Sequence, residues 1–336
     1  MPLSYPLLIV YDSYIKVGNI IECLKKKVSV RRLRKLCELI ARVSPSLRVF
    51  SATELKKATK RFRKDRVVTS DDGSVQTFYK GCINDTTHAP SRTKTKVAVS
   101  VMECLQHSPR PKHVWKISKE EAESLGEIHH PNLVKLLGYC YEDTKSLLVF
   151  EYSHKGSLHD HIFGKEEALP WETRVKIAIG IAQAIAFLHS IKKIPLHQEL
   201  HMHNIILDEQ YNAKLLYLDS KKRLIGDDGR IVATTYLPLE LALSCHAGAK
   251  TDVFTYGVIL LELFTRSKGE LLCLNSLDIR TRSFGETIDP RLESDYPMRA
   301  AAKMGRLIQR CTKRNWTERP SMQHVLDVLN YISCKY

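Results

Sequence analysis

The chain has 336 residues, of which 43% are hydrophobic and 26% charged, and its formal net charge at pH 7 is +15. This length suits one bilobal domain or two ordinary domains, with enough apolar residues for a buried core. No apolar run approaches the roughly 20 residues of a membrane span. The short apolar opening lacks a basic start and soon reaches Asp12, which argues against a secretory signal.

The positive charge is concentrated near the N-terminus. Residues 1–66 hold 17 Lys and Arg against 5 Asp and Glu, a net charge of +12. The rest of the chain holds 35 against 32, a net charge of +3. A nucleic-acid-binding body is therefore not indicated, because the main part of the chain is nearly balanced.

Nine cysteines are scattered along the chain without a Cys-x-x-Cys pair. This pattern favours reduced thiols in the cytosol over a disulfide framework or a zinc site. His201 and His203 lie two residues apart, but they fall between Glu199 and Asn204, two positions that receive other roles below. We therefore predict no metal site.

A basic N-terminal extension covers residues 1–49. Seven Lys and Arg occur within residues 25–35, and apolar residues recur every three or four positions over 21–43. This spacing predicts one or two basic amphipathic helices. Such a helix could pack on the following domain, or it could bind a partner or an anionic membrane surface. The chain lacks the Met-Gly start needed for myristate, which leaves Cys23 or Cys37 as candidates for palmitate.

Residues 50–152 are rich in predicted strands. The segment opens with a helix for which Thr53 is the predicted N-terminal cap. Runs of β-branched and aromatic residues predict three strands, with one helix between the second and the third. The predicted strands are 75–80, 96–102 and 147–152, and the predicted helix is 117–128.

Residues 153–336 are mainly helical in their apolar periodicity. The predicted helices are 171–191, 252–264, 300–311 and 322–332. A strand-rich part followed by a helical part is typical of an α+β protein. We therefore expect a small lobe at 50–152 and a large lobe at 153–336.

Four sequence stretches carry a family resemblance. LGEIHHPNLVKLLGYC at 125–140, LVFEY at 148–152, DVFTYGV at 252–258 and RPSM at 319–322 occur in the order and at the spacing of protein kinases. From about residue 50 to its end, the chain resembles the plant receptor-like cytoplasmic protein kinases, especially the class VII group. The resemblance implies a bilobal kinase fold, with helix C in the strand-rich small lobe and a mainly helical large lobe.

The resemblance also locates the catalytic positions, and none of them is intact. Ser100 stands where the family has the lysine that holds the phosphates of ATP, Glu199 replaces the general-base aspartate, and Tyr217 replaces the magnesium-binding aspartate. Kinase catalysis depends on positioning and on charge stabilisation around the phosphate and its magnesium ions. A serine carries no charge, and a neutral phenol is a poor ligand for magnesium. We therefore expect the chemistry to be lost.

The nucleotide pocket departs from the family in the same way. Of the three glycine positions in the phosphate-binding loop, only Gly73 is glycine, while Asp71 and Gln76 occupy the other two. The remaining pocket positions implied by the resemblance are Glu121 on helix C, Phe150, Asn204 and Asp219. Asp219 could replace the lost metal ligand only if the preceding strand shifted by two residues. We therefore expect no useful binding of ATP or magnesium.

By contrast, positions that hold a kinase fold together match the family. The resemblance pairs Glu240 with Arg319 in a buried ion pair, and it assigns to Asp252 the support of the catalytic loop. An apolar column between the lobes is implied at Leu125, Leu218 and His197.

These expectations point to a pseudokinase that acts as a binding, adaptor or decoy module in plant receptor-kinase or immune signalling. The implied partners are receptor kinases, related cytoplasmic kinases or immune receptors, and residues 21–43 could meet an anionic membrane. The implied location is the cytoplasm, at the inner face of the plasma membrane. One alternative is a weak Ser/Thr kinase that uses Glu199 and Asp219. Nucleic-acid binding by the basic extension is disfavoured, because no aromatic residues are interleaved with its cations.

Overall fold

The computed structural model divides the chain into two units, Met1–Leu47 and Arg48–Tyr336. The structure describes residues 47–69, 75–84, 96–103, 118–142, 145–165, 167–191, 200–218, 238, 248–267, 284–293 and 295–335. The helices predicted over 21–43, together with Cys23 and Cys37, lie outside these residues. The second unit starts two residues before the predicted boundary, because Arg48 and Val49 already pair with the sheet.

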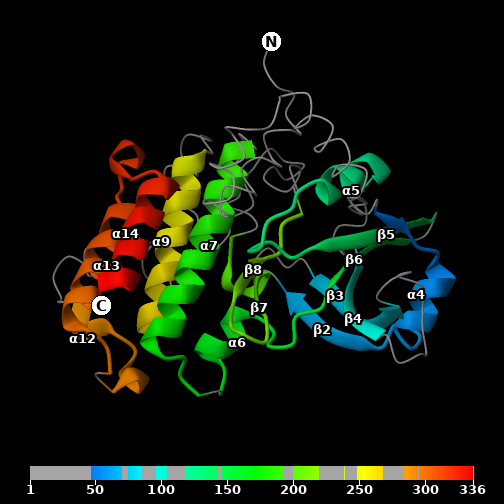
Figure 1. Ribbon diagram of the computed structural model, residues 1–336, viewed down its shortest axis with the longest axis horizontal. Helices are drawn as coiled ribbons and strands as arrows, with labels where there is room; N and C mark the ends of the chain where they lie inside the picture. The colour runs from blue at the N-terminus through cyan, green and yellow to red at the C-terminus, as the bar shows by residue number, and fades with distance from the viewer. Residues whose placement is uncertain are drawn as a thin grey trace, which may run out of the picture. The chain divides into compact units, whose positions relative to one another are not determined.

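The small lobe is built on a six-stranded sheet with the order β1-β5-β6-β4-β3-β2 (Figure 1). Its strands are β1 (Arg48–Val49), β2 (Lys64–Thr69), β3 (Val75–Asn84), β4 (Lys96–Glu103), β5 (Leu136–Glu142) and β6 (Lys145–Glu151). Neighbouring strands are antiparallel except β1 and β5, which are parallel. The three predicted strands are present as β3, β4 and β6, and three further strands complete the sheet.

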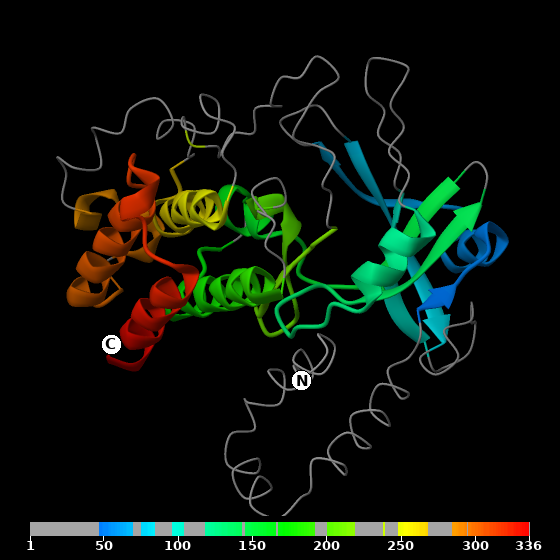
Figure 2. The same cartoon turned by 90° about the horizontal axis from the view of Figure 1, so that it is seen from above.

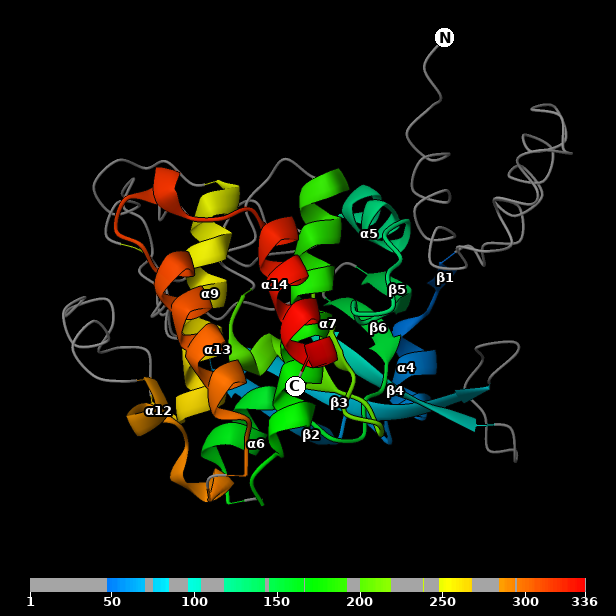
Figure 3. The same ribbon diagram turned by 60° about the vertical axis from the view of Figure 1, so that its left-hand side comes forward.

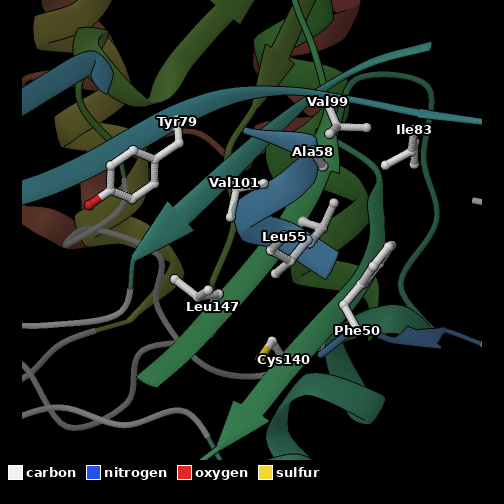
Figure 4. Close-up of a cluster of buried hydrophobic side chains, with 10 residues drawn as sticks. Phe50, Leu55, Ala58, Tyr79, Ile83, Val99, Val101, Cys140 and Leu147 are labelled. Carbon is white, nitrogen blue, oxygen red and sulfur yellow. The ribbon is translucent and has the colours of Figure 1, made fainter. Parts of the chain in front are cut away.

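Helix α4 (Ala52–Ala58) covers one face of this sheet. Leu55 and Ala58 of the helix, with Phe50 just before it, are buried in one apolar cluster with Val99 and Val101 of β4. Figure 4 shows these side chains gathered between the helix and the strands. Burial of a full Leu or Phe side chain typically contributes about 1.5–3 kcal/mol, so this cluster is a major source of small-lobe stability.

The cap of α4 is Ser51, and the prediction of Thr53 is wrong. The backbone N–H of Glu54 donates to the Ser51 hydroxyl over 3.2 Å, and the Glu54 carboxylate accepts the backbone N–H of Ser51 over 2.9 Å. This reciprocal pair is a capping box, and its signature is a serine followed three residues later by glutamate. Thr53 lies inside the first turn.

A close approach of two strands requires the glycine in β5. A Cβ atom added at Gly138 would lie 2.2 Å from the carbonyl oxygen of Arg48 and 2.6 Å from the ring of Phe50. Any side chain at this position would therefore push β1 away from β5.

The large lobe contains four long helices (Figures 1 and 3): α7 (Trp171–Ile191), α9 (Ala249–Thr265), α13 (Met298–Cys311) and α14 (Met322–Lys335). All four were predicted from the apolar periodicity. In Figure 3, α13 lies beside α9 and α14 lies beside α7. The short elements are α6 (Leu158–Phe163), α12 (Phe284–Thr287), η1 (Met202–Asn204), η2 (Pro290–Leu292), η3 (Trp316–Glu318) and the hairpin of β7 (Ile205–Leu207) with β8 (Ala213–Leu215).

Helix α7 has 21 residues and is apolar enough to cross a membrane by length and composition alone, contrary to the expectation that no such run exists. More than half of its most apolar window is nevertheless buried inside the lobe, where it packs against α9 and α14. We therefore interpret α7 as a core helix.

A buried ion-pair network joins α7 to the segment before η2. The Arg174 guanidinium donates to Asp289 over 2.7 Å and to the backbone carbonyls of Leu263 and Leu169 over 2.7 and 2.8 Å. Arg291 lies 2.8 Å from the same carboxylate. Burial alone would raise the pKa of Asp289, but the hydrogen bonds from Arg291 and Arg174 outweigh it and lower this pKa to about 2.

Candidate functional site

A cavity of about 320 Å³ is lined by residues of the sheet and of the large lobe. Its apolar lining consists of Phe78, Val134, Phe150, Tyr152, Ile206 and Leu216. The lining is as polar as it is apolar, since seven further residues are polar or charged: Asp65, Ser100, Glu151, Ser153, His154, Lys155 and Asp160.

Ser100 is half-buried and lies at this cavity, on β4. It is paired with Phe150 of β6 on one side and with Lys80 of β3 on the other. Side chains of directly opposed residues lie on the same face of a sheet, so Lys80 is the nearest candidate to replace the missing lysine. Its ammonium group instead lies over the ring of Tyr152, 4.2 Å from the ring centroid.

The cationic groups near the cavity are engaged by other partners. Lys214 lies 2.6 Å from the carboxylate of Glu151, a lining residue. The ammonium of Lys155, another lining residue, lies 4.8 Å from the ring centroid of Tyr211. Positive charge in this region is therefore neutralised or directed toward aromatic rings.

Carboxylates are the other charged lining groups. Asp160 lies at the cavity, and its pKa is lowered to about 2 by the His159 imidazole, 3.5 Å away, and by the Ser157 hydroxyl, 2.7 Å away. Asp160 is therefore ionised at neutral pH. Asp65 of β2 adds a further carboxylate, beside those of Asp160 and Glu151. Among the described lining residues, three carboxylates therefore stand against one ammonium, that of Lys155.

Asn204 and Tyr217 lie close behind the cavity. Neither is among the described residues that line it. Both are buried, with 4% and 8% of their surface exposed. The backbone N–H of Leu216, which does line the cavity, donates to the carbonyl of Asn204 over 2.8 Å. Leu218 and Leu125, predicted for the apolar column, are also buried.

Glu121 differs from the expected pocket position. It lies in the first turn of α5 (Lys119–Gly126), the helix predicted over 117–128, and its side chain is exposed. Its carboxylate accepts the backbone N–H of Ser118 over 2.8 Å, while its own N–H donates to the Ser118 hydroxyl over 3.1 Å. The glutamate thus completes a capping box, because α5 begins only two residues earlier.

Several predicted site positions cannot be placed. Gln76 lies in β3 opposite Val68 of β2, and only its backbone position is described. Five further positions lie outside the described residues: Gly73, His197, Glu199, Asp219 and Glu240.

Asp252 has a well-defined environment. Its side chain is fully buried at the start of α9, and its carboxylate lies 2.7 Å from Nε2 of His189 at the end of α7. This contact ties the end of α7 to the start of α9.

Arg319 is buried and held by backbone groups. Its guanidinium donates to the carbonyls of Lys313 over 2.7 Å and of Lys250 over 3.1 Å, and it lies 4.8 Å from the ring centroid of Phe254. A third, longer bond of 3.4 Å reaches the carbonyl of Arg314. The residue therefore fastens the segment after α13 to the start of α9.

Three imidazoles gather beside the cavity. The rings of His159 and His203 stack with centroids 3.8 Å apart, and that of His201 lies 6.0 Å from His203. Within the described ranges, no group of three or more His, Cys, Asp or Glu side chains has the arrangement of a metal site.

Comparisons with known proteins agree with this fold. The family model described as protein tyrosine and serine/threonine kinase matches residues 70–329. The chain is 51% identical to the inactive serine/threonine-protein kinase BKN2 of Arabidopsis thaliana, over 94% of this chain and 99% of that protein. It is 55% identical to the inactive serine/threonine-protein kinase BKN1 of the same plant, over 83% of this chain and 87% of that protein.

A solved structure supports the fold independently. The co-crystal of the pseudokinase DRIK1 (drought responsive inactive kinase 1) with ENMD-2076 superposes with a TM-score of 0.62 at 22% identity, over 87% of this chain and 98% of that one. The predicted α+β bilobal kinase-like fold is confirmed. The chain belongs to the protein tyrosine and serine/threonine kinase family, and it is a catalytically degenerate member of it, a pseudokinase.

Proposed function

We propose that this pseudokinase acts as a binding module, an adaptor or decoy, in plant receptor-kinase or immune signalling, and that it uses neither ATP nor magnesium. The observation that carries the proposal is the charge around the cavity. Ser100 supplies no cation, Lys80 lies over Tyr152, and Asp160 is anionic. A cavity with this lining disfavours the phosphates of a nucleotide, so the fold is left with binding as its function.

The proposed partners are receptor kinases, related cytoplasmic kinases or immune receptors. The resemblance to the plant receptor-like cytoplasmic kinases supports this choice, and kinase-family relatives support protein partners in general. The nearly balanced charge of residues 67–336 supports protein partners over nucleic acid.

The absence of nucleotide binding can be measured by thermal unfolding. We expect the melting temperature to stay unchanged in millimolar Mg-ATP. A ligand at 100 times its Kd would stabilise the fold by about 2.7 kcal/mol, which corresponds to roughly 4–5 °C for a domain of this size. An active kinase in the same buffer serves as the positive control.

A second readout separates binding from catalysis. Transfer of labelled phosphate that disappears in Glu199→Ala would contradict the proposal and establish the weak-kinase alternative. We further expect Ser100→Lys alone to leave the melting temperature insensitive to Mg-ATP, because Asp160 and Tyr217 remain.

We propose a cytoplasmic location at the inner face of the plasma membrane. The sequence of the extension supports it, since each of its cations would contribute about 1 kcal/mol near an anionic leaflet. We expect weak binding to anionic vesicles that falls as salt rises, because exposed charges are screened over about 8 Å at physiological ionic strength. The binding should disappear when the basic residues of 25–35 are neutralised. Equal binding to neutral vesicles would contradict this location.

A further inference from the structure

Helix α13 carries a row of cations along one side. Arg299, Lys303, Arg306 and Arg310 follow one another at intervals of four, three and four residues, and the helix contains no Asp or Glu. At 100° per residue, these four positions fall within about 60° of arc and extend over about 16 Å. We call these four residues the α13 row.

The opposite side of α13 is in the core of the large lobe. Ala300, Met304, Leu307 and Ile308 are buried, and the helix packs against α9. Figures 1 and 2 show α13 on the outer side of α9. It lies at the end of the large lobe that is farthest from the six-stranded sheet. The α13 row therefore faces away from the core and is remote from the cavity.

No carboxylate neutralises the α13 row within the described parts of the chain. Arg310 donates to Nε2 of His324 over 3.1 Å, and the ammonium of Lys303 lies 3.9 Å from the ring centroid of Tyr331. Both partners, an imidazole and a phenol ring, belong to α14. Arg299 and Arg306 are exposed.

Exposed apolar side chains occur on α13 itself and on α14 and η3. Among the described residues, five large hydrophobic side chains are exposed, and three of them belong to α13, η3 and α14. Met298 precedes the row with 66% of its surface exposed, Tyr331 contacts Lys303 and is 45% exposed, and Trp316 follows α13 at 50%. Arg, Trp, Tyr and Met are the residue types enriched in protein–protein interfaces, which distinguishes this surface from an ordinary solvated helix.

We propose that the α13 row is a docking surface for an acidic, extended segment of a partner protein. This inference rests on the proposed function as a binding module and names the chemistry of the partner. In an extended chain, alternate residues lie about 6.6 Å apart on one side. That distance is close to the intervals of about 6, 4.5 and 6 Å between the cations of the row. An acidic residue at every second position would therefore match the row.

Charge decides between this partner and the other occupants. The chain's own N-terminal extension is strongly basic and would be repelled by the row. A flat anionic membrane would also meet the exposed carboxylate of Asp327, which lies on α14 between His324 and Tyr331.

The test measures binding of a fluorescent peptide to the full chain. The probe alternates glutamate and serine over about 12 residues, more than enough to span the row when extended, and its control alternates glutamine and serine. We expect anisotropy to report binding of the glutamate peptide alone, with a loss of affinity in about 1 M salt, where the screening length is about 3 Å.

Charge-reversal variants locate the site. Arg299→Glu with Arg306→Glu is expected to weaken peptide binding about tenfold or more, because two attractions become repulsions. The matched control, Lys56→Glu with Lys57→Glu, changes two exposed lysines of α4 by the same net charge and should alter affinity less than twofold. Arg299→Lys with Arg306→Lys keeps the charge and should keep the binding. Equal losses in the row variant and the α4 variant would overturn the proposal.

A photo-crosslinking version of the peptide provides a direct readout. We expect crosslinks to α13 and α14, and crosslinks confined to residues 1–46 would overturn the proposal. Loss of anionic vesicle binding in the row variant, with peptide binding intact, would reassign the row to a lipid surface. If the peptide does not bind at all, the docking proposal is wrong. The proposed function is contradicted only by the Mg-ATP experiments, so the two proposals are tested separately.

Discussion

Replacement of Asp289 by alanine is expected to lower the free energy of unfolding by about 3–5 kcal/mol. The carboxylate is fully buried between Arg174 and Arg291, and Arg174 is itself fully buried. Its removal would leave one guanidinium in the core without a counter-charge, still bound to two backbone carbonyls. Urea unfolding monitored by circular dichroism measures the change as a shift of the midpoint at constant slope.

Two comparisons make this result specific. Asp295→Ala removes an exposed carboxylate a few residues away and should change stability by less than about 0.5 kcal/mol. Asp289→Asn keeps the volume and one acceptor oxygen, so its cost should lie between those of the other two variants. A cost for Asp289→Ala as small as that for Asp295→Ala would contradict the network.

The same carboxylate makes stability depend on pH. Its pKa is about 2 in the folded chain and about 3.9 in an unfolded one. Because the folded pKa is the lower of the two, the stabilisation is complete above about pH 4 and is lost as the pH falls toward 2. In Asp289→Asn this part of the acid dependence should be absent, which titration of the unfolding midpoint can detect.

The second large effect is expected at Arg319. Arg319→Ala should cost about 3–5 kcal/mol, since it removes the charged donor for the carbonyls of Lys313 and Lys250 and the contact with Phe254. Arg319→Lys should recover only part of this loss, because an ammonium cannot reproduce the planar fork of a guanidinium. Urea unfolding again provides the measurement.

The control for this variant is Arg314→Ala. Arg314 is exposed close to Arg319 in the chain, so the loss of its side chain should leave stability nearly unchanged. If Arg319→Ala also leaves stability unchanged, the segment after α13 is not fastened to α9 as described. The ion pair between Arg319 and Glu240 stays a prediction, because Glu240 lies outside the described residues.

Elements with strong periodicity could be predicted from sequence. The four long helices follow from their apolar spacing, and β4 follows from its alternation, which buries Val99 and Val101 toward α4 while Ser100 lies at the cavity. Strands β2 and β5 were missed for a physical reason. The first three residues of β2 are charged, and β5 contains Gly138, which only the approach of β1 explains.

The site shows the same contrast between local and long-range information. Ser100 and Phe150 could be placed at the cavity from the resemblance and the strand pattern. The exposure of Glu121 could not be placed in this way, because it depends on the residue at which α5 begins and on the capping box that Glu121 forms there. The contact of the Lys80 ammonium with the Tyr152 ring joins β3 to the residue after β6, far apart in sequence, and leaves no local signal in either segment.

Helix α4 has a practical consequence for anyone who expresses part of this protein. The family model begins at residue 70, whereas Phe50, Leu55 and Ala58 precede it and cover one face of the small-lobe sheet. A fragment cut at the family boundary would expose Val99, Val101 and Val149 to water as one apolar patch. Patches of this kind promote aggregation. The smallest fragment that keeps this sheet covered and soluble therefore begins at or before Arg48, some twenty residues ahead of the boundary that sequence families suggest.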